Sequence, residues 1–188
     1  WHRYVSRLWL GGVFLFFYMP LMFLVVFSFN STRQDSQFTG FSLRWYQALG
    51  QDTRLVEGFL LSLNVALLSA TLATVLATLA AYALIRFGAF KGRSLFNAML
   101  SSPLVMPEVI IGLSLLLLFV GLEPWVGWPG RGATTIVLGH ALLGMAYATV
   151  VVQSRLKEMD RSIEEAALDL GCRPYQVFFL VTLPNISQ

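Results

Sequence analysis

The sequence predicts an all-α protein that crosses a membrane several times. Of its 188 residues, 56% are hydrophobic and only 12% are charged, and the mean hydropathy is +0.68. An ordinary soluble domain carries about 25% charged residues, so a soluble fold of this size would have too few charges to cover its surface. Four long apolar stretches are the second observation, because a helix needs roughly 20 apolar residues to cross the hydrocarbon core.

The four apolar stretches are the expected transmembrane helices. They lie at residues 8–29, 59–85, 96–119 and 134–152. Lipid offers no hydrogen-bond partner to backbone N–H and C=O groups, so each stretch should be α-helical. We therefore expect a single transmembrane domain over residues 1–188.

The first stretch has two interpretations. Arg3 and Arg7 precede it, as in a secretory signal. However, it is longer than the apolar part of a signal, and the bulky Phe27 and Phe29 stand where a cleavage site requires small residues. We interpret it as a retained membrane anchor.

Small residues recur every four positions along the second stretch and form two rows. One row is Ser62, Ala66, Ala70, Thr74 and Thr78, and the other is Ser69, Ala73, Ala77 and Ala81. Small residues at this spacing let helix backbones approach closely in lipid. The pattern predicts a close-packed interior helix.

The third and fourth stretches contain the polar candidates. Pro103 and Pro107 each remove a backbone donor and predict kinks in the third stretch. Glu108 follows directly, and a carboxylate within a span is a functional candidate, here for a cation path. It could equally cap the half-helix after Pro107 or pair with a neighbouring subunit. His140 in the fourth stretch is more typical of an interhelical hydrogen bond than of a proton relay.

Lys and Arg are unevenly distributed between the two sides that these spans define. With the N-terminus inside, the cytoplasmic side has nine: Arg3, Arg7, Arg86, Lys91, Arg93, Arg155, Lys157, Arg161 and Arg173. The other side has four: Arg33, Arg44, Arg54 and Arg131. This bias predicts a cytoplasmic N-terminus, and it places the polar segment after residue 152 inside the cell.

That cytoplasmic segment, residues 153–184, contains a short amphipathic helix. Ser162 and Glu165 fit a capping box that starts it, and Gly171 fits its C-terminal cap. One face is apolar: Ile163, Ala166, Ala167 and Leu170. The acids lie on other faces: Glu164, Glu165 and Asp169. Pro174 starts a second apolar segment, which Pro184 is expected to end.

The amphipathic helix has two possible partners. Its apolar face is short and has alanines at its centre, which suits docking into a groove of another protein. A helix lying on lipid is the alternative, but such helices usually carry Lys or Arg on the polar face. Acidic residues there favour a protein partner.

The segment also resembles a known family pattern. Glu165-Ala166-Ala167, three residues, Gly171, nine residues and Val181-x-Leu183-Pro184 are similar to the EAA loop of ABC-importer permeases, with Val181 in place of Ile. The resemblance implies the type-1 importer permease fold and a coupling helix that seats on an ATP-binding subunit. The implied coupling residues are Glu164, Glu165, Ala166, Ala167, Gly171, Leu183 and Pro184.

Other motifs resemble those of polyamine permeases of the spermidine/putrescine type. They are Ser28-Phe29-Asn30, Arg44-Trp45-Tyr46, the run from Arg86 to Gly92, the run from Pro103 to Glu108 with Gly112 to Leu115 after it, and the run from Asp160 to Glu165. Family members have six spans, so we expect this chain, which begins at Trp1 and ends at Gln188, to be a fragment that lacks two. The resemblance implies a bacterial inner-membrane subunit that pairs with a sister permease, an ATP-binding cassette subunit and a polyamine-binding protein outside the membrane.

We expect no catalysis and no cofactor in this chain. It has no Gly-x-x-x-x-Gly-Lys-Ser/Thr motif, so ATP and Mg²⁺ would bind the partner ATPase. With one Cys and two His, a metal site or a membrane oxidoreductase is not expected. Nor do we expect a nucleic-acid partner. The alternatives are an importer subunit for another small solute and a secondary transporter driven by an ion gradient, which would predict inverted repeats.

Overall fold

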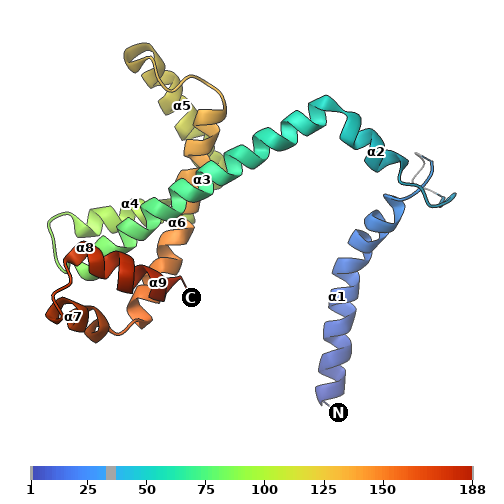
Figure 1. Cartoon of the computed structure of the whole chain (residues 1–188). Helices are drawn as coiled ribbons and strands as arrows, with labels where there is room; N and C mark the ends of the chain where they lie inside the picture. Colours follow the sequence, from blue (N-terminus) through green and yellow to red (C-terminus); the bar gives the residue numbers. More distant parts are fainter. Residues whose placement is uncertain (1, 33–36, 188) are drawn as a thin grey trace. The chain divides into compact units, whose positions relative to one another are not determined.

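The computed structural model describes residues 2–32 and 37–187, so Arg33 lies outside the described residues. Within these ranges the regular secondary structure is helical apart from one isolated bridge between Asn30 and Phe41, and Figure 1 shows the elements in order. They are α1 His2–Phe27, α2 Arg44–Gln51, α3 Thr53–Arg86, α4 Arg93–Val105, α5 Glu108–Val126, α6 Ala133–Glu158, α7 Arg161–Asp169, α8 Pro174–Val177, the π-helical turn η1 Phe178–Thr182 and α9 Leu183–Ile186.

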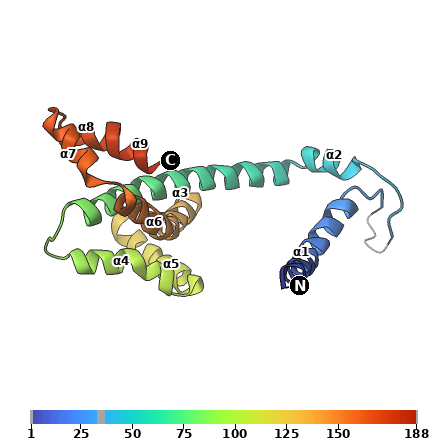
Figure 2. The same cartoon turned by 90° about the horizontal axis from the view of Figure 1, so that it is seen from below.

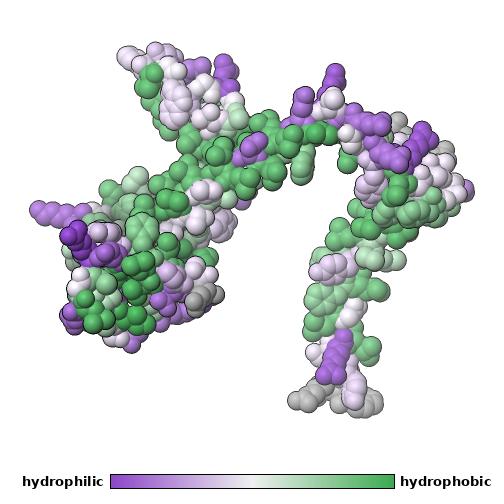
Figure 3. All heavy atoms as spheres, in the orientation of Figure 1, coloured by the Kyte–Doolittle hydropathy of each residue, from purple (hydrophilic) through white to green (hydrophobic). Residues whose placement is uncertain are grey.

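Four helices in the described part of the chain are long and apolar enough to cross a membrane. They are Tyr4–Phe27, Thr53–Arg86, Glu108–Val126 and Ala133–Glu158. Hydrophobic side chains cover most of the visible surface of the long helices (Figure 3), which a soluble protein rarely shows over such an area. The prediction of an all-α protein with four spans is confirmed.

The fold divides at Leu60 into two units. In the first unit, Asn30, which follows α1, is buried with 2% of its surface exposed. The indole Nε1 of Trp45 donates to the carbonyl oxygen of Asn30 at 2.9 Å, and the rings of Phe29 and Tyr46 stack at 5.3 Å. Two of the sequence motifs noted above therefore contact each other.

In the second unit, α6 crosses α3 through small residues. Of the two rows on α3, the one formed by Ser69, Ala73, Ala77 and Ala81 is buried, whereas only Thr78 of the other row is buried. A Cβ on Gly144 of α6 would lie only 3.1 Å from the Cβ of Ala73. The prediction of a close-packed interior helix is confirmed for the buried row.

The third apolar stretch differs from the prediction, because residues 96–119 form parts of two helices and not one kinked span. Met106, the residue before Pro107, is extended with ψ 142°, as the proline ring demands of its predecessor. Pro107 is extended too, with ψ 131°, and α5 begins after it. Pro103 stays inside α4, which packs Leu100 against α3.

Candidate functional site

Helix α7, which is predicted to be cytoplasmic, is capped by Asp160 and not by the predicted capping box. The Asp160 Oδ1 atom accepts a hydrogen bond from the backbone N–H of Ser162 at 3.0 Å, and this bond lowers the pKa of the Asp160 carboxyl below its usual value. Ser162 lies in the first turn, and Glu165 faces Arg161 at 3.3 Å in an exposed pair. Asp160 already occupies the capping position two residues earlier, so Ser162 has no cap to form.

The other end of α7 confirms the prediction for Gly171. This residue has a φ of +87°, in the left-handed region that favours glycine. The N–H of Cys172 donates to the carbonyl of Ala167 at 3.1 Å, and the N–H of Gly171 donates to that of Leu168 at 2.9 Å. This pair of bonds is a Schellman motif, and it turns the chain back toward α8.

A buried ion pair attaches α7 to α3. The Glu164 Oε2 atom lies 2.8 Å from Nε of Arg86, the last residue of α3, and the two side chains are 9% and 11% exposed. The Thr182 hydroxyl donates to Glu164 Oε1 at 2.6 Å. Nearby, the ring of Tyr82 meets that of Phe178 edge-on at 5.0 Å. We call Arg86, Glu164 and Thr182 the α7 anchor.

The anchor corrects the expectation that Glu164 lies on an outer, polar face of α7. The predicted apolar face is the one left open: Ile163 is 44% and Leu170 86% exposed, Ala166 is exposed, and Ala167 is half-buried. In both views, α7 to α9 lie beside the C-terminal end of α3 (Figures 1 and 2). An apolar helix face is therefore presented outward from a fixed base.

The sequence predicted that Pro184 ends the second segment, and the structure shows that this prediction is wrong. Pro174 starts α8, the chain widens into η1, and α9 continues from Leu183 to Ile186. A proline inside an α-helix clashes with the carbonyl of the residue four positions earlier, and a π-helical turn relieves this by displacing that carbonyl. Leu183 is half-buried and Pro184 is exposed.

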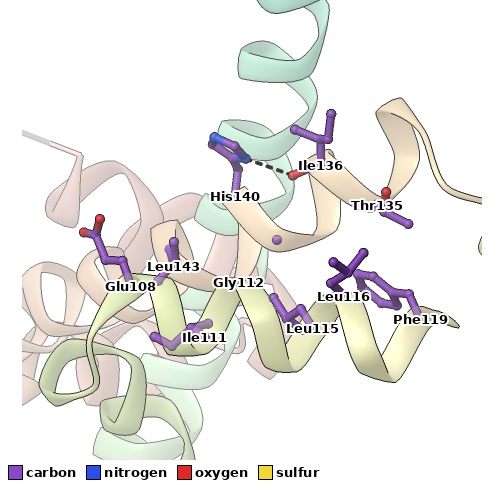
Figure 4. Close-up of a pocket in the computed structure, with 11 residues that line it drawn as sticks. Glu108, Ile111, Gly112, Leu115, Leu116, Phe119, Thr135, Ile136, His140 and Leu143 are labelled. Atoms are coloured by element: carbon purple, nitrogen blue, oxygen red, sulfur yellow. Dashed lines mark hydrogen bonds between the residues drawn. The ribbon is translucent and has the colours of Figure 1, made fainter. Parts of the chain in front are cut away.

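A second candidate site lies between α5 and α6. A pocket of about 270 Å³ is lined mainly by apolar side chains of both helices, with Glu108 and His140 among its polar residues. Figure 4 shows the Glu108 carboxylate and the His140 ring on the same side of the two helices. Glu108 is exposed at the first residue of α5. Nδ1 of His140 bonds to the carbonyl of Ile136 of the same helix at 2.9 Å, and the interhelical role of the ring stays a prediction.

Comparison with known proteins assigns the family. Residues 73–188 match the family described as the binding-protein-dependent transport system inner membrane component. The match covers more than half of the chain, including both candidate sites. The chain belongs to this family.

Curated members of this permease family align along almost the whole chain. The putrescine transport system permease protein PotI of Escherichia coli K12 is 51% identical over 92% of this chain. The spermidine/putrescine transport system permease protein PotC is 33% identical over 96% of it, both in Escherichia coli K12 and in Haemophilus influenzae. The aligned region is 62% of the length of PotI and 67% of that of PotC from Escherichia coli.

Sequence reasoning missed the partners of Glu164 in this family member. The sequence placed Arg86 only in the charge count and in a family-like run, and it placed Thr182 in an apolar segment; neither suggested a partner for Glu164. The available signal was a cation at the end of a span and a hydroxyl within an apolar run, both on the predicted cytoplasmic side. For a metal, the described residues contain no group of three His, Cys, Asp or Glu that could hold one.

Proposed function

We propose that this chain is a permease subunit of an ATP-driven polyamine uptake system. The observation that carries the proposal is the 51% identity with a putrescine permease over 92% of the chain. Its partners would be a sister permease, an ATP-binding cassette subunit and a polyamine-binding protein outside the membrane. Together with the sister permease it would form the translocation path.

Helix α7 would be the contact with the ATPase. Its exposed face combines Ile163, Ala166 and Leu170, and a short apolar face of this kind fits a groove in a protein. Glu165 is exposed beside that face and is available to a basic group of the ATPase. Glu164 would act from behind the contact, through the α7 anchor. Leu183 and Pro184 support the same loop.

The ATPase contact requires α7 on the cytoplasmic side, and hence a cytoplasmic N-terminus. The bias of Lys and Arg supports this orientation. In a Cys172→Ser background, Lys91→Cys should resist an impermeant thiol reagent added outside intact cells, whereas Gln37→Cys should react. The opposite labelling pattern would overturn the orientation.

Glu108 would face the path of the cationic substrate. Its carboxylate has no hydrogen bond or ion pair within the described residues, and the adjoining pocket is otherwise mainly apolar. A charge in such surroundings is costly unless it is used or paired. In the complete transporter, Glu108→Gln should lower the affinity for polyamine without lowering the amount of protein in the membrane. Unchanged uptake would leave helix initiation as the role of Glu108.

The test of the function is uptake by the full-length protein, reconstituted with its sister permease, ATPase and binding protein. Labelled putrescine and spermidine should accumulate only with ATP inside the ATPase-facing compartment, and an ionophore should not stop them. Uptake that follows an ion gradient without ATP would establish the secondary transporter instead. ATP-dependent uptake of another solute, without uptake of polyamines, would support an ATP-driven importer but overturn polyamine as its substrate.

A further inference from the structure

The α7 anchor joins two parts of the chain that are far apart in sequence. Arg86 ends α3, and Glu164 lies in the first turns of α7. Their side chains meet at 2.8 Å with about a tenth of each exposed. Thr182 adds a hydrogen bond to the same carboxylate at 2.6 Å. One carboxylate thus connects the span, the cytoplasmic helix and the segment that follows it.

Burial makes this pair different from the other ion pairs of the loop. Arg161 and Glu165 lie 3.3 Å apart with about two-thirds of each side chain exposed, and such surface pairs hold little. A buried pair must give up its hydration, so apolar residues would often stabilise a loop as well or better. A buried charge pair adds geometric specificity, because its hydrogen bonds require one relative orientation of the two groups. The anchor therefore fixes where α7 sits on α3.

The guanidinium of Arg86 also has donor capacity in reserve. Although Nε is close to Glu164, neither Nε nor Nη2 makes a well-directed hydrogen bond to another described residue, and both are buried. A buried donor without an acceptor is costly. A small shift of α7 that moved the carboxylate from Thr182 toward Nη2 would give the two-pronged arrangement that Arg and carboxylates favour. Arg86 thus keeps a buried donor, Nη2, that a shifted carboxylate would meet.

A series of contacts connects α7 to the membrane-spanning helices α3 and α6. The apolar face points outward, and Glu164 points inward to Arg86. Tyr82, one turn earlier on α3, contacts Phe178 of η1 edge-on. Further along, α3 meets Gly144 of α6 at Ala73, where a Cβ would be only 3.1 Å away. This close contact leaves α3 little room to move without α6.

We propose that Arg86 and Glu164 are positioning residues that transmit movement of α7 to α3. They would convert ATP use by the partner into rearrangement of the spans, and Thr182 would select between the present position of the carboxylate and the shifted one. This inference rests on the proposed function and adds to it the residues behind the contact. In this proposal the exposed apolar face of α7 binds the ATPase, and the α7 anchor transmits the movement of α7 to α3.

The test compares charge reversals in the full-length transporter, reconstituted with its sister permease, ATPase and binding protein. Arg86→Glu and Glu164→Arg should each lower uptake per ATP hydrolysed about tenfold. The double variant Arg86→Glu/Glu164→Arg should restore most of that ratio. A matched control is Arg155→Glu/Glu158→Arg, because this pair is exposed, is 3.7 Å apart and lies at the end of α6. The control should keep the wild-type ratio.

A milder variant covers the case in which the reversals do not assemble. Glu164→Gln keeps the size of the side chain and an oxygen for Thr182, and removes only the charge. It should reach the membrane and co-purify with the ATPase, yet hydrolyse more ATP per molecule taken up. Thr182→Val, which frees the carboxylate, should alter the same ratio by less.

The ratio separates transmission from support of the fold. If Glu164→Gln assembles and keeps the wild-type ratio, the proposal is overturned and the anchor only holds the loop in place. The same holds if the reversals reduce assembly alone. If the wild type and the Arg155/Glu158 control show no ATP-dependent uptake, the proposed function fails first and the inference falls with it.

Discussion

The crossing of α3 with α6 and the attachment of α7 to α3 are built from opposite kinds of residue. At the crossing, Ala73 and Gly144 have almost no side chain, so the two helix backbones can approach closely. At the attachment, Arg86 and Glu164 are long, charged and buried. One contact depends on shape and the other on charge.

The difference follows from the surroundings of each contact. Between spans, lipid is as apolar as the side chains, so association depends on close backbone approach. Beside the C-terminal end of α3, α7 buries few of its apolar residues against its own chain, because Ile163 and Leu170 stay exposed. A helix that keeps its apolar face for a partner needs another means of attachment. Added volume should therefore disrupt the crossing, and removed charge should disrupt the attachment.

The largest effect is expected from Glu164→Leu. The substitution leaves Arg86 buried without its carboxylate, and breaking a buried pair in this way costs about 3–5 kcal/mol. Thermal unfolding of the purified full-length protein in detergent measures it. Glu165→Leu is the matched control one residue away, because its exposed pair contributes only about 0–1 kcal/mol. Equal shifts for the two variants would show that burial of the pair does not matter.

At the crossing, Gly144→Leu should destabilise by overpacking, at a cost of about 1–3 kcal/mol. Gly121→Leu in α5 is the control, because a Cβ there meets nothing within 4 Å. Ala73→Gly removes the methyl group that faces Gly144, so it should partly rescue the variant in a double-mutant cycle. If Ala73→Gly did not rescue Gly144→Leu, or if a change of charge did, the contact would not depend on shape.

Gly171→Ala tests the end of α7, which neither volume nor charge controls. No atom lies within 4 Å of its Cβ position, but its φ of +87° disfavours a side chain and costs roughly 1 kcal/mol. The fold should survive, while ATPase co-purification weakens because the helix no longer ends at the same place. Gly121→Ala, in a helix, should change neither. If Gly171→Ala retained full association, the end of α7 would not guide docking.

Sequence reasoning succeeded where the determinant is local. Apolar length predicted that there are four spans, although it placed the third at 96–119 and the structure has it at Glu108–Val126. Four-residue spacing predicted the packed row on α3, and Gly171 marked the end of α7. These features depend on neighbours within a few turns of the same helix. The break at Pro107 was only half recognised, because a proline in an apolar run fits both a kink and a helix end.

The sequence could not predict the inward direction of Glu164. In a nine-residue helix, two faces can be buried, and the choice depends on what lies behind it. Here the partner is Arg86, and three complete helices, α4, α5 and α6, separate it from Glu164 in sequence. Periodicity identified the apolar face correctly but assigned it no direction, and nothing local distinguishes Glu164 from Glu165. The choice is made by tertiary contact, at the point where the proposed coupling occurs.

The smallest expected effect is at the start of α7, where a charge acts without burial. The hydrogen bond from Ser162 lowers the pKa of Asp160 in the folded protein. The stabilisation is therefore present above the unfolded pKa, about 3.9, and is lost as the pH falls through the lower folded value. Asp160→Asn keeps an oxygen that can cap the helix but does not titrate.

Comparison of the wild type with Asp160→Asn isolates this contribution, because all other carboxyls titrate in both proteins. The thermal unfolding temperature of the wild type relative to that of Asp160→Asn should be highest at about pH 6 and should fall by about pH 3, below the unfolded pKa. A difference independent of pH would mean that the Asp160 charge contributes nothing to the cap. In that case only the buried charge of Glu164 would distinguish the attachment of α7 from the crossing of the spans.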